Sequence, residues 1–290
     1  MTALDIGSGK GPRDENFPVA SRFIARRHRP VILAFYRFVR AADDVADHPR
    51  LSAADKLAHL DRLERSLDGE VDRAEGVALA SALRARGVSD VHAKQLLSAF
   101  RQDVVKRRYA DWDELMDYCA RSAMPVGRFV LDVHGEPRLT WGRSDALCAA
   151  LQIVNHLQDC ARDFRDLDRV YLPADILAAH GAEVSDLAAP RAGPALASCL
   201  RALAARTEAL LRQSDGFEHI VADRRLAAEI AAIRALAQRL VRLLQRRDPL
   251  SEAVHLGKVN ALAVGAGAGA RLLLRRALRP RAARNRLRTS

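Results

Sequence analysis

The 290-residue sequence contains few cysteines and few aromatic residues, and its hydrophobic runs are short. The longest apolar stretch, 259–270, is too short to span a bilayer and includes three glycines. No apolar segment typical of a signal peptide occurs in residues 1–13, which we expect to form a flexible leader. No pair of cysteines has the C-x-x-C spacing of a metal or redox site, so we expect buried, reduced thiols. The four are Cys119, Cys148, Cys160 and Cys199.

Signals for β-strands are also scarce. Runs of β-branched residues are few, and no Asn-Gly or Asp-Gly pair separates two alternating segments. Alanine, leucine and arginine, which favour helices, dominate the composition. The sequence therefore predicts an all-α fold. The expected helices include one that begins at a Ser52 cap, one over 194–213 and one over 217–247. Because no linker rich in glycine or proline divides the chain, we expect one domain over residues 14–278, followed by a basic tail over 279–290.

Acidic residues are missing from the end of the chain. None follows Glu252, and eight arginines lie between Arg271 and Ser290. Without this segment the net charge falls from +11 to about +3, which argues against a nucleic-acid partner. The tail has two interpretations, a disordered solubilising end or a segment attracted to anionic lipid. We expect a cytoplasmic protein, and the second interpretation would add peripheral membrane contact through this tail.

One acidic stretch lies near the end of a helix predicted to run from residue 31 to Asp47. Asp43 and Asp47 are four residues apart, so both carboxylates leave the same face of the helix. Arg40 and Tyr36 lie on that face, one and two turns earlier. Acidic side chains repel one another, and they are unfavourable at a helix C-terminus unless a cation compensates them.

A second polar stretch interrupts an apolar helix predicted from Ser144 to Asp163. Gln152, Asn155, Asp159 and Asp163 follow one another at helical spacing. A polar stripe at such positions suggests a polar cavity inside a helical bundle. Either stretch alone is more often a solvated helix face than a site. Together, the two carboxylate pairs would form an oxygen-rich cage of the kind that Mg²⁺ prefers.

These residues resemble the motifs of a known family, the squalene and phytoene synthases. The first aspartate-rich motif of that family is similar to Tyr36-x-x-x-Arg40-x-x-Asp43-Asp44-x-x-Asp47. The second is similar to Gln152-x-x-Asn155-x-x-x-Asp159-x-x-x-Asp163, followed by Arg169-Val170-Tyr171-Leu172-Pro173. The central segment is similar to Arg108-Tyr109-x-x-Trp112-x-Glu114-Leu115 with Tyr118-Cys119. The resemblance runs from about Asn16 to about Leu262 and covers most of the chain.

The resemblance implies a single-domain, all-α isoprenoid synthase bundle with a central cavity. Such enzymes join two prenyl diphosphates head to head through a cyclopropyl intermediate, with Mg²⁺, and release diphosphate. By position, the Mg²⁺ ligands would be Asp43, Asp47, Asp159 and Asp163. The residues that contact diphosphate or steer the carbocation would be Tyr36, Arg40, Gln152, Asn155 and Tyr171. Further substrate contacts would come from Asn16, Phe17 and Arg169.

Some positions depart from the common pattern of the family. Gln158 stands where relatives usually have arginine, and the segment from Asn16 to Ser21 replaces a serine-rich one. These features resemble the branch of the bacterial hopanoid pathway, which ionises presqualene diphosphate and captures the cation with water to give hydroxysqualene. The alternatives are the head-to-head condensation itself, giving presqualene diphosphate, squalene or phytoene, or a non-catalytic partner among neighbouring enzymes of the pathway.

Three other features receive a more ordinary interpretation. The glycines between Gly265 and Ala270 fit a dinucleotide-binding fingerprint, but that fingerprint requires a βαβ unit. We expect these small residues to permit close helix packing or to line the cavity, and we expect no reductive step. His156 lies one position off the polar stripe and is expected to be structural. Asp103, with Arg107 and Arg108, forms either a polar cluster or an exposed ion pair.

Overall fold

A computed structural model describes residues 24–278, with only the backbone described for 258–263 and 275–278. The predicted leader, Asn16, Phe17 and the tail over 279–290 lie outside the described residues. Within them the structure is helical and has no strand, which confirms the all-α prediction. No helix in the described range is long and apolar enough to cross a membrane.

Twelve α-helices and two short 3₁₀ helices make up the described part of the chain. The first six are α1 (Arg29–Ala46), α2 (Ala53–Leu67), α3 (Ala74–Arg86), α4 (Val91–Val105), α5 (Trp112–Ser122) and α6 (Met124–His134). After η1 (Arg138–Thr140) come α7 (Trp141–Leu167), α8 (Ala174–Ala179), η2 (Val184–Ala188) and α9 (Pro194–Gln213). The last three are α10 (Phe217–Ile220), α11 (Arg224–Leu244) and α12 (Lys258–Leu278).

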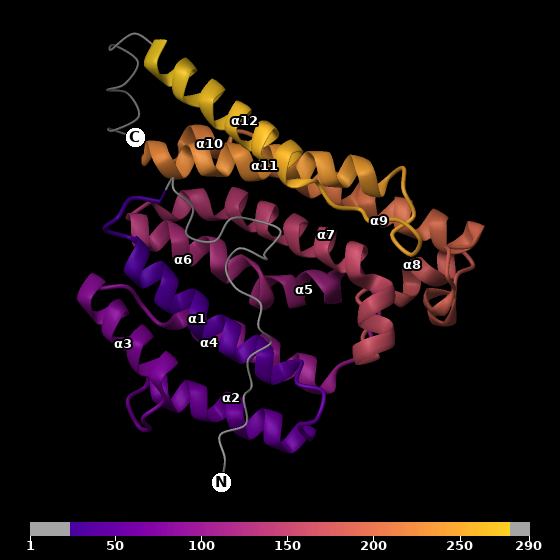
Figure 1. The fold of residues 1–290 in the computed structure, drawn as a ribbon, viewed down its shortest axis with the longest axis horizontal. Helices are drawn as coiled ribbons and strands as arrows, with labels where there is room; N and C mark the ends of the chain where they lie inside the picture. Colours follow the sequence, from indigo (N-terminus) through magenta and orange to yellow (C-terminus); the bar gives the residue numbers. More distant parts are fainter. Residues whose placement is uncertain (1–23, 279–290) are drawn as a thin grey trace.

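The long helix α7 lies in the middle of a single bundle (Figure 1). Helices α1 to α4 form one side, with α1 packed on α3 and α4, while α9 and α11 cover the other side of α7. Helix α12 packs along the outside of α11. Because α7 contacts α5, α6, α9 and α11, polar side chains on it are enclosed by the bundle.

Two apolar clusters form the core. One lies among α1 to α4 and is centred on fully buried side chains such as Phe38, Leu63 and Leu97. The larger one surrounds α7 and includes Ile153 and Leu157. The polar stripe predicted on α7 therefore runs beside a large apolar core, and the apolar residues between its members fix the orientation of the helix.

Several helix boundaries match the sequence pattern, because their caps are local. The hydroxyl of Ser52 accepts a hydrogen bond from the Asp55 N–H at 3.1 Å and begins α2, as predicted. Helix α9 occupies 194–213, the predicted range, with Pro194 in its first turn. Gly135 ends α6 in the left-handed conformation, at φ 70°. Helix propensity and capping alone determine these ends.

Tertiary contacts explain two of the boundaries that were predicted wrongly. Helix α7 begins at Trp141 rather than at a Ser144 cap, because η1 runs directly into it and Ser144 is buried. The helix predicted over 217–247 is divided into α10 and α11. The Glu136 carboxylate accepts hydrogen bonds from the N–H groups of Ala222 and Asp223, and Asp223 in turn caps α11.

The small residues of α12 allow it to approach α11 closely. A Cβ atom on Gly269 would lie 3.3 Å from the Ala228 carbonyl oxygen, and one on Gly265 would lie 3.5 Å from the Ala232 side chain. Both glycines are buried. These contacts support the interpretation of the glycine-rich segment as a helix-packing surface.

Candidate active site

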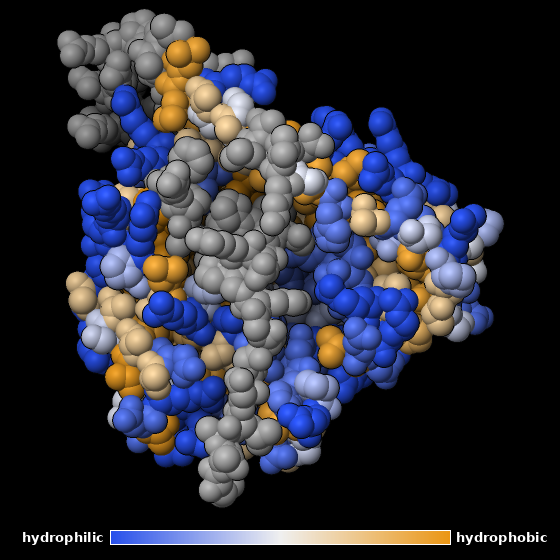
Figure 2. All heavy atoms as spheres, in the orientation of Figure 1, coloured by the Kyte–Doolittle hydropathy of each residue, from blue (hydrophilic) through white to orange (hydrophobic). Residues whose placement is uncertain are grey.

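The two acidic stretches lie near the C-terminal ends of α1 and α7. Asp43 is in the last turn of α1 and Asp47 is its C-cap. Asp159 and Asp163 belong to the last third of α7, which ends at Leu167. A hollow surrounded by hydrophilic residues is visible beside α5 and α7 (Figure 2). The local spacing gives each pair its common face, as the sequence predicts.

Arg169, in the segment after α7, connects the two acidic helices. Its Nη1 lies 3.0 Å from the Asp47 Oδ1 and donates to the Tyr171 hydroxyl at 3.2 Å. Its Nη2 donates to the main-chain carbonyl of Asp103 at 3.0 Å. The residue is only 4% exposed. One buried guanidinium therefore holds together the end of α1, the end of α4 and the segment after α7 that carries Tyr171.

A buried carboxylate lies behind this contact. Asp103 accepts hydrogen bonds from the hydroxyls of Tyr118, at 2.7 Å, and Tyr171, at 3.1 Å. Burial raises the pKa of Asp103 to about 6 and raises the pKa values of both tyrosines well above their usual range. The phenols therefore remain neutral donors. Neither predicted arrangement of Asp103 with Arg107 and Arg108 is found. Asp103 belongs to a buried cluster with the two tyrosines, while Arg108 pairs with Asp168 at 2.5 Å and Arg107 donates to the Leu167 carbonyl.

The rings of four residues pack together beside these hydroxyls and form what we call the aromatic wall: Tyr109, Tyr118, His156 and Tyr171. The His156 ring stacks on Tyr171 with a centroid distance of 3.6 Å, and the centroids of Tyr109 and Tyr171 are 5.5 Å apart. Burial lowers the pKa of His156 to about 3, so its imidazole is neutral. The His156 Nε2 lies 3.2 Å from the Gln152 Nε2 and accepts a hydrogen bond from that amide group. His156 thus orients two members of the site, Gln152 and Tyr171.

In each aspartate pair, the negative charge of one carboxylate opposes ionisation of the other. Burial and the neighbouring Asp47 raise the pKa of Asp43 to about 7, and burial and Asp159 raise the pKa of Asp163 to about 7. Asp47 also contributes to the raised pKa of Asp163, so the two pairs lie within electrostatic reach of each other. Arg40 compensates part of the charge, at 3.0 Å from Asp43 and 2.8 Å from Asp44.

This donor set fits Mg²⁺. It offers carboxylate oxygens with an excess of negative charge in a partly enclosed space, which suits a hard cation that also binds phosphate. A different cluster in the described range, His28, His134 and Asp223, has ligand atoms within 4.8 Å of one another. Arg27 and Arg86 each lie 2.9 Å from a ring nitrogen of His28, and their positive charge opposes a cation there.

Comparison with known proteins explains why these residues occur together. The profile of squalene/phytoene synthase matches residues 11–260 of the chain. The chain belongs to the squalene/phytoene synthase family. It is 54% identical over 276 residues to the hydroxysqualene synthase of Rhodopseudomonas palustris, covering 95% of the chain and 94% of that relative. It is 52% identical to the hydroxysqualene synthase of Sinorhizobium fredii, covering 93% of the chain and 95% of the relative.

Solved structures of the squalene/phytoene synthase family share the fold. The squalene synthase HpnC from Alicyclobacillus acidocaldarius superposes with a TM-score of 0.71 at 33% identity, over 79% of this chain and 87% of that one. A dehydrosqualene synthase bound to a ligand gives a TM-score of 0.78 at 20% identity, over 89% and 92%. The second likeness shows the fold alone. Both agree with the helical bundle described above.

Within this candidate site, the structure brings together part of the predicted set. Contacts or electrostatic coupling join Arg40, Asp43, Asp47, Asp159, Asp163, Arg169 and Tyr171. Tyr36 is half-buried on α1, two turns before Asp43, and Asn155 is half-buried on α7. The predictions missed the role of Asp103 and gave Tyr118 none. One signal in the sequence could have indicated a buried role for Asp103. It is an acidic residue among apolar residues of the same helix, such as Ala99 and Val104.

Gln158 makes a contact that its sequence position did not predict. Its side-chain amide donates to the Val254 carbonyl, and its Nε2 lies 3.5 Å from the His255 Nδ1. The residue is only 9% exposed. The position before Asp159 therefore anchors the segment that leads into α12 and brings no positive charge to the aspartates.

Proposed function

We propose that the chain converts presqualene diphosphate to hydroxysqualene, in the C30 branch of isoprenoid biosynthesis. The observation that carries the proposal is its 54% and 52% identity, over more than nine-tenths of the chain, to two proteins named hydroxysqualene synthase. The two carboxylate pairs and the buried aromatic wall provide the groups that such a reaction needs. In the reaction the C–O bond to diphosphate breaks with its electron pair, water adds to the carbocation, and one proton is released.

Asp43, Asp47, Asp159 and Asp163 would hold Mg²⁺, which when bound neutralises charge on the departing diphosphate. Arg40 lies beside the first pair and provides a guanidinium for phosphate oxygens. Arg169 keeps Asp47 in place, and we count it among the substrate contacts. These residues bind and orient the diphosphate end of the substrate.

The hydrocarbon end requires a different surface. The rings of Tyr171, Tyr118 and His156 are uncharged, so their faces can stabilise a carbocation without providing an anionic nucleophile. The apolar core around α7 excludes bulk water from this wall. We propose that the amide groups of Gln152 and Asn155 position the one water molecule that reacts. Both lie on the same helix as Asp159.

Product analysis distinguishes this function from its alternatives. The enzyme is incubated with Mg²⁺ and without NADPH, once with farnesyl diphosphate and once with presqualene diphosphate, and products are identified by mass spectrometry. Hydroxysqualene from presqualene diphosphate alone is expected. Presqualene diphosphate or phytoene-type products would instead establish the condensation reaction. No product from either substrate would favour a non-catalytic partner of a neighbouring pathway enzyme.

Metal dependence is tested independently of turnover. Diphosphate with Mg²⁺ is expected to raise the melting temperature of the wild type, because a ligand that binds only the folded state stabilises it. Asp47→Asn and Asp163→Asn should lose this shift, while Asp61→Asn, an exposed aspartate of α2, should keep it. A full shift in both site variants would remove these carboxylates from the metal site.

We also propose a cytoplasmic protein whose basic tail, 279–290, contacts anionic membranes. The five arginines of 279–290 support the contact, and the four cysteines, all without a disulfide, fit a reducing compartment. Deletion of 279–290 is expected to move the protein from the membrane fraction to the soluble fraction of a cell lysate. An unchanged distribution would contradict the role of the tail.

A further inference from the structure

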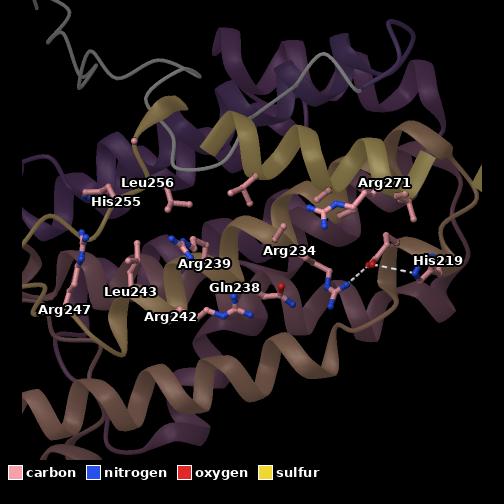
Figure 3. Close-up of a pocket in the computed structure, with 17 residues that line it drawn as sticks. His219, Arg234, Gln238, Arg239, Arg242, Leu243, Arg247, His255, Leu256 and Arg271 are labelled. Atoms are coloured by element: carbon pink, nitrogen blue, oxygen red, sulfur yellow. Dashed lines mark hydrogen bonds and ion pairs between the residues drawn. The ribbon is translucent and has the colours of Figure 1, made fainter. Parts of the chain in front are cut away.

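A second cavity lies away from the aspartates, between α11, α12 and the loop that joins them. It has a volume of about 820 Å³. Arg239, Arg242 and Gln238 approach it from α11, and Arg271 approaches it from α12 (Figure 3). His219 and His255 lie at its edges. We call this cavity the arginine pocket.

The arginine pocket has an excess of positive charge. Five arginines line it, Arg234, Arg239, Arg242, Arg247 and Arg271, against one acid, Glu218. Arg234 already pairs with Glu218 at 2.6 Å and also with Asp215, and Arg247 lies 3.8 Å from Glu252.

The other three arginines of the pocket lack such compensation. In the described part of the chain Arg239, Arg242 and Arg271 have no carboxylate partner, and Arg271 donates only to a carbonyl of its own helix, that of Gly267. Like charges gathered around one cavity repel one another unless an anion joins them.

The guanidinium groups determine which kind of anion the pocket would bind. Their planar N–H donors match the oxygens of phosphate in a bidentate manner. Part of the remaining lining is apolar, with Leu243, Leu256 and Leu272 among its members. A ligand that contacts both the arginines and the apolar lining carries a phosphate group on an apolar body. The pocket therefore has the chemistry of a site for a phosphate-bearing amphiphile.

The surface next to the pocket indicates where such an amphiphile resides. Leu273 and Leu274, which directly follow Arg271 and Leu272, are 39% and 63% exposed. Among the described residues they are the one adjacent pair of large apolar side chains left exposed. A helix that combines exposed leucines with arginines is typical of one lying in the interface of an anionic membrane. A site for a free metabolite has no need of these leucines.

We propose that the arginine pocket binds the phosphate head group of an anionic membrane lipid. Arg239, Arg242 and Arg271 contact the phosphate oxygens, and Leu273 and Leu274 enter the acyl-chain boundary of the same leaflet. Helix α12 then lies on the membrane, while the aspartates of α1 and α7 belong to a separate site. This surface is distinct from the tail over 279–290, which is retained in every variant below.

The test uses the full-length protein and floating vesicles of phosphatidylcholine, with or without phosphatidylglycerol. A triple variant, Arg239→Gln with Arg242→Gln and Arg271→Gln, removes the uncompensated charges. A matched control, Arg62→Gln with Arg84→Gln and Arg201→Gln, removes three exposed arginines of α2, α3 and α9 and has the same net charge. Circular dichroism and turnover of detergent-dispersed presqualene diphosphate report on folding and on the active site.

The pocket variant is expected to bind anionic vesicles about 100-fold more weakly than the control, since each of the three arginines adds roughly a factor of five. Leu274→Ser should reduce binding further at unchanged charge. Both should keep wild-type turnover in detergent, which separates this proposal from the catalytic one. Equal vesicle binding by the two triple variants would overturn the proposal.

Two further arms identify the source of the phosphate. Inorganic phosphate and diphosphate are titrated into the protein by calorimetry in the absence of lipid. Weak heats that do not depend on Arg239 and Arg242 are expected. Tight binding lost in the triple variant, together with unchanged vesicle binding, would make the pocket a site for a free phosphate compound and refute the lipid assignment.

Discussion

Arg169 and Asp47 are 122 residues apart in the sequence, yet the Arg169 Nη1 lies 3.0 Å from the Asp47 Oδ1. The same guanidinium also reaches Tyr171 and the Asp103 carbonyl. The guanidinium therefore connects Asp47, a predicted metal ligand, to Tyr171 of the aromatic wall. The effects expected of substitutions in this part of the site depend on that connection.

Replacing Arg169 with methionine should destabilise the fold and abolish activity. The substitution removes the donor to the buried Asp103 carbonyl and to the Tyr171 hydroxyl, and the positive charge beside Asp47. We expect a loss of about 2–3 kcal/mol in the free energy of unfolding. Urea denaturation measures this loss. Arg107→Met removes an exposed arginine that donates to the Leu167 carbonyl and should cost less than about 0.5 kcal/mol. Equal losses in the two variants would contradict the bridging role.

Asp103→Asn should lower kcat with little effect on KM. Both phenols donate to Asp103, whereas asparagine has one acceptor oxygen and presents its NH₂ group to the other phenol. Misplacing one ring of the wall should reduce kcat about tenfold, corresponding to one hydrogen bond to a charged group.

A double-mutant cycle checks whether Asp103 acts through Tyr118. If it does, Asp103→Asn in a Tyr118→Phe background should reduce kcat by much less than in the wild type, because contacting residues are non-additive. Full additivity would show that Asp103 affects the reaction by another route, or only through stability.

His156→Phe should make the protein less sensitive to acid. Burial lowers the pKa of His156 to about 3 in the folded state, while the unfolded chain protonates near 6.5. The unfolded state thus binds the proton first, so the wild type loses stability as the pH falls from 6.5 towards 3. Between pH 6.5 and 5 this contribution is about 2 kcal/mol.

Urea titrations of the wild type and His156→Phe at pH 7.5 and 5.0 measure that difference. The phenylalanine ring preserves the stacking on Tyr171 and cannot be protonated. The wild type should lose more stability than the variant between the two pH values. Parallel losses would mean that His156 is not protonated on unfolding in this range.

Gly76→Ala should destabilise the protein although alanine is the better helix former. A Cβ atom at this position would lie 1.8 Å from the Ser66 Oγ and 2.9 Å from the Leu67 main-chain nitrogen, so α3 must move away from α2. We expect a cost of about 2 kcal/mol. Gly142→Ala, in α7 with open space around it, should be neutral or gain up to about 1 kcal/mol. Thermal denaturation of the two variants compares them, and a stable Gly76→Ala protein would show that this helix contact is loose.

The sequence by itself determined the helical class, most helix ends and the register of both aspartate pairs. These features depend on interactions between residues a few positions apart. Spacing of four places Asp43 above Asp47 on one face, and Ser52 and Pro194 begin helices through local caps. The motifs also identified the family, because each lies within one helix and its flanking residues.

Only the tertiary structure decided which distant residues meet. The division between α10 and α11 requires Glu136 of another segment. The role of Asp103 requires Tyr118 from α5, and Arg169 and Tyr171 from the segment after α7. The arginine pocket exists because Gly265 and Gly269 allow α12 to lie against α11, which brings Arg271 towards Arg239 and Arg242. Helical periodicity specifies the face of each residue, but which faces pack together is determined by burial of apolar surface across the whole chain.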